Sequence, residues 1–193
     1  MFSAVILTPG RTGSHLIMKN LSKHYNTKWF HDSCDELKDN PSWTNSSGQE
    51  LGGIIHTHNP HFTPPTANFI AIFSQRADTF SAVCSSLIAK RTREYSYYSD
   101  SRLPNVVIRP QEFTHELNYH LSFFNLIDAS KYSNVVQINY EDMLGDAYYL
   151  FKKFGVLKKL ELIDSKSPYD YNQIISNVEQ LRNCYNELTH STN

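Results

Sequence analysis

The sequence has few cysteines and almost no net charge. The three cysteines, Cys34, Cys84 and Cys184, lie far apart and form no Cys-x-x-Cys pair. They therefore predict neither a disulfide framework nor a structural zinc site built on thiolates. Eighteen basic residues face nineteen acidic ones, which leaves a net charge of −1, whereas a protein that binds nucleic acid over a whole face usually has a basic excess. We expect a reducing compartment, a cytoplasmic location and no nucleic-acid partner.

Long hydrophobic runs are also missing. No apolar stretch approaches the roughly 20 residues of a membrane helix, and residues 1–9 lack the basic start of a signal peptide. We therefore expect no membrane partner and a chain that begins inside the cell. The 193 residues contain no internal repeat, low-complexity tract or marked boundary, and this length suits one domain. The prediction is a single domain over residues 1–193.

Short apolar runs alternate with segments of helical composition. Runs rich in β-branched and aromatic residues predict strands at 4–7, 53–58, 68–74 and 134–140. Helical composition marks 14–21, 78–91, 111–129, a stretch through 149 and 154, and 171–188. Residues 26–50 are polar and predict a loop with at most a short helix. Alternating strands and helices are typical of an α/β protein with a parallel sheet flanked by helices on both faces.

The segment after the first strand predicts an anion-binding turn. Thr8 to His15 lies between a strand and a helix, and ligands of parallel sheets collect beyond the carboxyl ends of the strands. Backbone amides of such a turn, together with the positive end of the helix, bind anions. Gly13 would let the backbone approach an oxyanion closely, and Arg11 would add charge. The alternative is an ordinary strand-to-helix turn.

This turn does not fit the ATP-binding pattern G-x-x-x-x-G-K-[ST]. When the pattern is aligned on Gly13, its first glycine falls on Thr8 and its lysine on Ser14. A nucleotide kinase or GTPase is therefore disfavoured. The hydroxyl groups of Thr12 and Ser14 remain candidate donors to an anion.

A second group of candidate residues ends the strand at 53–58. His56 and His58 differ by two positions, so both side chains leave the strand on one face. His58 is close to the strand end at Pro60, where it could take a proton from an attacking hydroxyl. His56, His58 and His61 could instead supply three imidazoles to a metal-dependent hydrolase, or they could be solvated strand-end residues.

Arg76 and Ser85 follow the strand at 68–74. Arginine and hydroxyl groups are suited to gripping a phosphate. Ser86 is a rival to Ser85 in this role. Arg76 could equally pair with a surface carboxylate, and Ser85 could be a small core residue.

These sites, in this order, resemble those of the PAPS-dependent sulfotransferases, whose donor is 3′-phosphoadenosine 5′-phosphosulfate (PAPS). The likeness lies in four segments, at residues 9–16, 55–60, 75–85 and 140–143, the last reading Tyr-Glu-Asp-Met. The resemblance implies a P-loop-like sulfotransferase fold and transfer of a sulfuryl group to a hydroxyl or amine. The acceptor would be a small molecule or carbohydrate, the product 3′-phosphoadenosine 5′-phosphate (PAP), and no metal would be needed.

The resemblance also implies roles for particular residues. Arg11 would contact the leaving phosphate and the transferring sulfuryl group, and His58 would be the catalytic base. Arg76 and Ser85 would hold the 3′-phosphate, and Tyr140 would lie near the adenine. The implied donor-binding residues are Arg11, Thr12, Gly13, Ser14, His15, Arg76, Ser85 and Tyr140.

Several alternatives stay open beside this interpretation. Glu36 competes with His58, because some branches of the family use a glutamate base. Residues 93–110, with Tyr95, Tyr97 and Tyr98, could form an acceptor lid or simply cover the edge of the core. Lys166 to Tyr169 is the best substitute for a missing basic loop over the 3′-phosphate. The short chain could use a second subunit, as a homodimer, to complete the acceptor site, or it could be a non-catalytic nucleotide-binding module.

Overall fold

The computed structural model describes residues 2–31, 43–44, 46–92, 105–146, 148–155 and 171–190. The chain forms two compact units. The sheet unit consists of Met1–Ala77 and Phe123–Ser165, and the helical unit of Asp78–Ser122 and Lys166–Asn193. The expectation of one domain over 1–193 stays a prediction.

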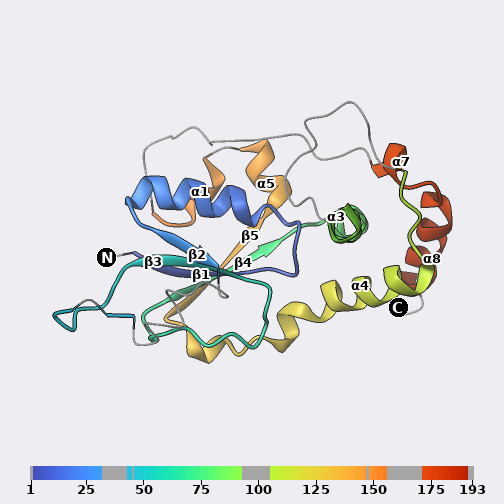
Figure 1. Cartoon of the computed structure of the whole chain (residues 1–193). Helices are drawn as coiled ribbons and strands as arrows, with labels where there is room; N and C mark the ends of the chain where they lie inside the picture. Colours follow the sequence, from blue (N-terminus) through green and yellow to red (C-terminus); the bar gives the residue numbers. More distant parts are fainter. Residues whose placement is uncertain are drawn as a thin grey trace. The chain divides into compact units, whose positions relative to one another are not determined.

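The sheet unit is built on five parallel strands in the order β2-β3-β1-β4-β5 (Figure 1). The strands are β1 (Ser3–Leu7), β2 (Trp29–His31), β3 (Gly53–Thr57), β4 (Ile70–Gln75) and β5 (Asn134–Asn139). β1 is central, and Ala4 to Leu7 are fully buried, as expected of a parallel strand covered on both faces. The predicted α/β class with a parallel sheet flanked by helices is confirmed.

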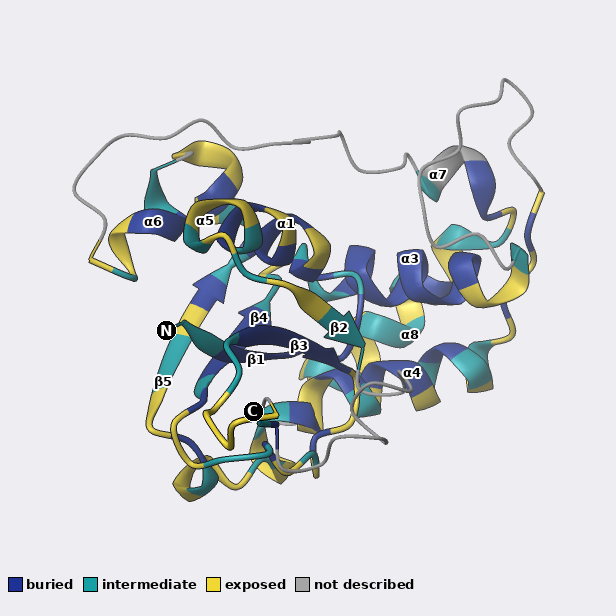
Figure 2. Ribbon diagram, turned by 60° about the vertical axis from the view of Figure 1, so that its left-hand side comes forward, coloured by how far each residue is buried: buried dark blue, intermediate teal, exposed yellow. Residues whose placement is uncertain are grey.

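Helices α1 (Ser14–Tyr25), α5 (Tyr140–Gly145) and α6 (Tyr149–Lys152) lie together on one face of the sheet (Figures 1 and 2). Their buried side chains form one core with the strands, in which Ile17, Met143 and Leu150 pack with Ile6 and Ile54. Two 3₁₀ turns, η1 (Phe123–Leu126) and η2 (Ala129–Lys131), precede β5. The parallel register places the carboxyl ends of β1, β3 and β4 side by side at one edge.

The helical unit contains α3 (Thr79–Thr92), α4 (Pro110–Ser122), α7 (Tyr171–Ile174) and α8 (Val178–His190). Asp78 caps α3, because its side chain accepts a hydrogen bond of 2.9 Å from the Ser81 amide. Pro110 begins α4, where its missing amide proton removes no helical bond. The buried side chains of the unit form a second core, which includes Val83, Phe113 and Leu181.

Three predictions about the elements are wrong. The segment 26–50 contains β2, a three-residue strand paired with β3, which is too short to give an alternating pattern. The helix expected over 111–129 ends at Ser122, and 3₁₀ turns follow. The helix expected over 171–188 is broken because Ile175 bridges to Val106 as in a parallel sheet.

None of the helices in the described ranges is long and apolar enough to cross a membrane.

Candidate functional site

The β1–α1 loop (Thr8–Gly13) has an unusual backbone conformation. Gly10, Arg11 and Gly13 have φ values of 114°, 55° and 81°. Positive φ is uncommon outside glycine, so Arg11 is held in a strained conformation of the kind that clusters at functional sites. Turns that mix left- and right-handed residues direct successive amides toward one point, where they bind anions. The backbone at this position therefore suits the predicted anion-binding turn.

Hydroxyl groups fix the base of the loop. Thr12 Oγ1 lies 2.5 Å from Thr8 Oγ1 and 2.8 Å from Ser74 Oγ, and Ser74 Oγ donates back to the Thr12 carbonyl at 2.9 Å. The Gly10 amide donates to Thr8 Oγ1 at 3.0 Å. Thr12 is only 2% exposed, so its hydroxyl ties the loop to β4. The expected contact of Thr12 with an anion stays a prediction.

The amino end of α1 supplies further amides. Ile17 makes the first helical hydrogen bond, 3.1 Å to the Gly13 carbonyl. The amides of Ser14, His15 and Leu16 therefore have no intrahelical partner, and the helix dipole adds a partial positive charge there. The side chain of Ser14 is buried, whereas that of His15 is exposed.

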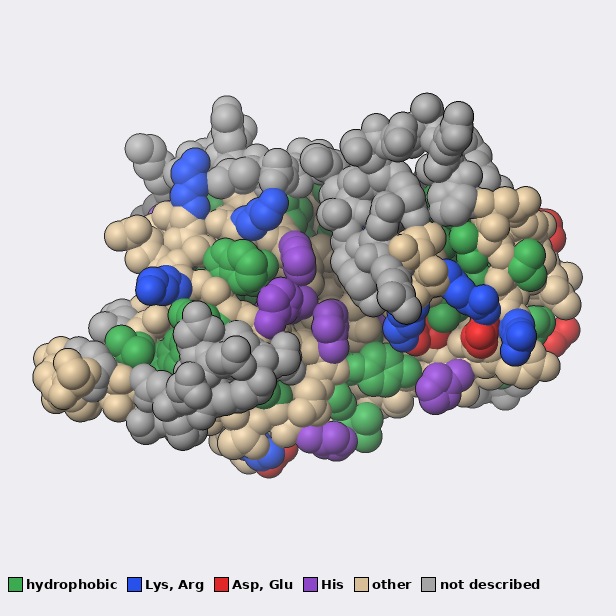
Figure 3. Space-filling view, viewed as in Figure 1, with side chains coloured by type: hydrophobic (Ala, Val, Ile, Leu, Met, Phe, Trp, Pro, Cys, Tyr) green, Lys and Arg blue, Asp and Glu red, His purple; other side chains and the backbone are tan. Residues whose placement is uncertain are grey.

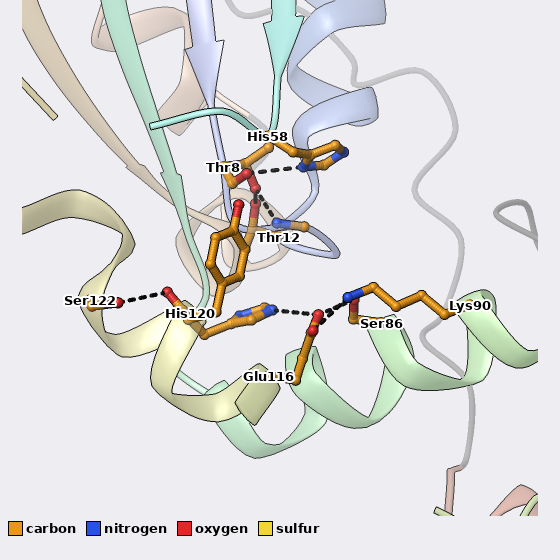
Figure 4. A network of polar contacts seen from close by, with 10 residues as sticks. Thr8, Thr12, His58, Ser86, Lys90, Glu116, His120 and Ser122 are labelled. Atoms are coloured by element: carbon orange, nitrogen blue, oxygen red, sulfur yellow. Dashed lines mark hydrogen bonds and ion pairs between the residues drawn. The ribbon is translucent and has the colours of Figure 1, made fainter. Parts of the chain in front are cut away.

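His58 is tied to the same loop. Its Nδ1 lies 3.0 Å from the Thr8 carbonyl oxygen (Figure 4). A carbonyl can only accept, so Nδ1 carries the proton and Nε2 of the neutral ring keeps its lone pair. The residue is exposed just beyond β3. This hydrogen bond orients the ring of the sequence-predicted base beside the loop.

Three further histidines come together next to His58. One ring nitrogen each of His15, His31 and His56 lies within 4.8 Å of the other two, and we call this trio the imidazole group. Its ring centroids are 5.1–5.9 Å apart. The His56 and His58 rings, predicted to share a face, lie 4.7 Å apart. Histidines gather visibly on this face of the molecule (Figure 3).

The imidazole group differs from the trio that the sequence suggested. It contains His56 but replaces His58 and His61 with His15 and His31. His31 escaped sequence reasoning because it lies on β2, which has no recognisable strand pattern. Its register opposite His56 follows from the pairing of β2 with β3, so recognising β2 would have identified it.

The environment keeps two rings of the imidazole group uncharged. Burial is the largest cause, and electrostatic repulsion from His58, His15 and His31 is the next; together they lower the pKa of His56 from 6.5 to about 2. Desolvation of the His15 ring, with the charges of His31 and Arg11 next in size, lowers the pKa of His15 as well. Histidines that are neutral at pH 7 present lone pairs to a proton or a metal ion.

The Tyr140 ring connects Arg76 with the β1–α1 loop, because it lies close to both. The Arg76 guanidinium carbon is 5.2 Å from the centroid of the Tyr140 ring, and its Nε is 3.7 Å from Glu141 Oε1. Glu141 Oε2 also accepts a hydrogen bond of 3.0 Å from the Ala77 amide. On the other side, a Cβ added to Gly13 would lie 2.4 Å from Tyr140 Cδ2. Tyr140 is 8% exposed, so its ring fills the space between the loop and the arginine.

The other predicted residues fall elsewhere. Ser85 is buried on α3 in the helical unit, and its role at the 3′-phosphate stays a prediction. Its rival Ser86 donates a hydrogen bond of 2.6 Å to Glu116, which also pairs with Lys90 (Figure 4). Predictions made for Glu36, Tyr95, Tyr97, Tyr98 and Lys166 to Tyr169 lie outside the described residues.

Comparison with known proteins yields no family. No family model matches the chain, and no curated protein matches it. A solved structure described as an uncharacterized protein from Eubacterium ventriosum aligns over 82% of this chain and 100% of that chain, with 14% identity and a TM-score of 0.39. Similarity at this level carries no argument about function.

Proposed function

We propose that the protein is a PAPS-dependent sulfotransferase acting on a hydroxyl or amine of a small-molecule or carbohydrate acceptor. Two observations support the proposal. The resemblance of four ordered sequence segments supplies the identity of the donor. The geometry around the β1–α1 loop, with His58 beside it, suits the binding of an anion next to a base.

The observation that carries the proposal is the hydrogen bond from His58 Nδ1 to the Thr8 carbonyl, at 3.0 Å. It attaches the candidate base to the first residue of the loop that would hold the 5′-phosphosulfate. It also leaves Nε2 as a proton acceptor, which is the state that a general base requires before reaction.

The reaction would be an in-line displacement, similar to phosphoryl transfer. The acceptor oxygen or nitrogen loses its proton to His58 Nε2 and forms a bond to sulfur. The bond between sulfur and the bridging oxygen breaks, and PAP leaves with the electron pair on its 5′-phosphate. Arg11 and the amides that begin α1 stabilise this developing charge, because they are preorganised donors.

The 3′-phosphate would bind near Arg76. The Arg76 side chain is 11% exposed and is steadied by Glu141 and the Tyr140 ring. A guanidinium that is already oriented loses little conformational freedom on binding. The positive charge of Arg76 would therefore favour PAP, which carries a 3′-phosphate, over adenosine monophosphate (AMP), which has none.

Calorimetric titration tests the donor assignment without knowledge of the acceptor. PAP should bind more tightly than ATP or AMP, and Arg11→Gln should weaken PAP binding. Lys23→Gln is the matched control, because it removes the same charge from an exposed site in the last turn of α1. Equal affinity for PAP and AMP would refute the donor assignment.

The role of His58 is tested by turnover. His58→Asn keeps a side-chain donor for the Thr8 carbonyl but removes the base, so PAP affinity should persist. Release of PAP from PAPS, measured with a panel of alcohols, phenols, sugars and amines, should fall about 10²- to 10⁴-fold. Tight PAP binding by the wild type without turnover on any acceptor would favour the non-catalytic binding module instead.

A further inference from the structure

We propose that the imidazole group, His15, His31 and His56, binds a divalent transition-metal ion, with Zn²⁺ as the best fit. The inference does not rest on the sulfotransferase proposal. It rests on three side chains that distant parts of the sheet unit bring together: the start of α1, the end of β2 and the penultimate residue of β3. We assign the ion no step in sulfuryl transfer.

The spacing of the ring nitrogens fits a metal site. Tetrahedral Zn²⁺ with zinc–nitrogen bonds of about 2.0–2.1 Å requires ligand nitrogens about 3.3 Å apart. The Nδ1 atoms of His31 and His56 are already 3.2 Å apart, and the ligating atoms of the trio are all within 4.8 Å of one another. Closing the widest gap needs a shift of at most about 1.5 Å. Rotation of the exposed His15 side chain provides a shift of this size.

Hydrogen bonding in the imidazole group is incomplete. His56 is 1% exposed, and its Nδ1 pairs with His31. Its Nε2 is buried and has no hydrogen-bond partner among the residues that the structure describes. A neutral imidazole places a donor on one nitrogen and an acceptor on the other, so one of them is left unsatisfied in either tautomer. The Nδ1 atoms of His31 and His56, which face each other at 3.2 Å, are therefore the atoms that an ion would join, and Nε2 of His56 would keep the proton.

The chemistry of the ligand set selects the metal. Imidazoles suit zinc, copper, iron and nickel, whereas magnesium and calcium prefer oxygen ligands. Three protein imidazoles around Zn²⁺ leave one position for water or an anion. The nearby charges of Arg11 and Lys19 oppose a bare cation and favour an anion in that position.

Metal titration tests the proposal directly. The full chain, purified without a polyhistidine tag and stripped with a chelator, is titrated with Zn²⁺ by calorimetry. We expect one equivalent to bind. Co²⁺ should bind at the same stoichiometry and give the intense visible absorption of a tetrahedral site. Weak binding of several equivalents without that absorption would overturn the proposal, since exposed histidines alone behave in this way.

Variants locate the ion. His15→Gln changes an exposed residue, so folding should persist by circular dichroism, and Zn²⁺ affinity should fall at least about tenfold. His31→Gln should have the same effect. His61→Gln is the matched control and should leave Zn²⁺ affinity unchanged. Wild-type affinity in His15→Gln, or loss of binding in His61→Gln, would contradict the proposed ligands. Since the titration contains no nucleotide, this inference and the sulfotransferase proposal can fail separately.

Discussion

Replacing Gly13 with alanine should destabilise the fold by two separate effects. The residue has φ of 81°, and the left-handed region costs a non-glycine residue about 1–2 kcal/mol. The added Cβ would also lie 2.4 Å from Tyr140 Cδ2 and 3.2 Å from Met143 Cε. Both side chains belong to the core, and overpacking of this kind costs typically 1–3 kcal/mol. We expect Gly13→Ala to lower the free energy of unfolding by roughly 2–5 kcal/mol.

Urea unfolding followed by circular dichroism measures this loss, which should appear as a lower midpoint with an unchanged slope. Gly48→Ala is the matched control. Gly48 has φ of 78°, but nothing lies within 4 Å of an added Cβ, so only the backbone cost of about 1–2 kcal/mol applies. Equal losses in the two variants would refute the packing of Tyr140 against the loop.

Three further predictions concern Thr12, Glu116 and Arg76. Thr12→Val should cost about 1–3 kcal/mol in urea unfolding, because it removes the buried hydroxyl that bonds to those of Thr8 and Ser74, whereas Thr12→Ser should retain most of the stability. Burial raises the pKa of Glu116, but the His120 ring 3.7 Å away and hydrogen bonds from Lys90 and Ser86 outweigh it and lower the pKa from 4.5 to about 2. The stabilisation by the carboxylate is therefore complete above about pH 4.5 and lost toward pH 2. The loss of unfolding free energy in Glu116→Gln, measured by urea unfolding across this pH range, should therefore shrink as the pH falls. A loss that stays constant with pH would contradict this. Arg76→Ala should weaken PAP binding by about 1.5–3 kcal/mol, or roughly 10- to 150-fold, and leave AMP binding unchanged in calorimetry.

The sequence predicts the sheet well where hydrophobic runs are continuous. β1, β3 and β4 are almost entirely buried, and their apolar runs depend only on local residues. β5 lies at the edge of the sheet with only Ile138 buried, but its β-branched residues still mark it as a strand. β2 fails this test because it has three residues, all partly exposed. Its existence depends on pairing with β3, which is a long-range interaction that no local pattern records.

The candidate site shows the same division. The position of the β1–α1 loop and of His58 follows from the strand-turn-helix order, so sequence reasoning identifies both. The Thr12 hydroxyl forms a 2.8 Å hydrogen bond with the hydroxyl of Ser74, which is 62 positions away in the sequence. Local sequence patterns do not predict such a contact. The imidazole group depends on β2 lying beside β3, so His31 could not be found before that pairing was known.

Backbone amide shifts of the isotope-labelled protein on addition of PAP test the central claim most directly. The account predicts large shifts at Arg11 through Leu16, where the amides of the β1–α1 loop and the first turn of α1 would meet the 5′-phosphate. It also predicts that Arg11→Gln reduces them at a given PAP concentration. Shifts confined to other parts of the chain, with residues 11–16 unchanged at saturating PAP, would contradict an anion site at this loop.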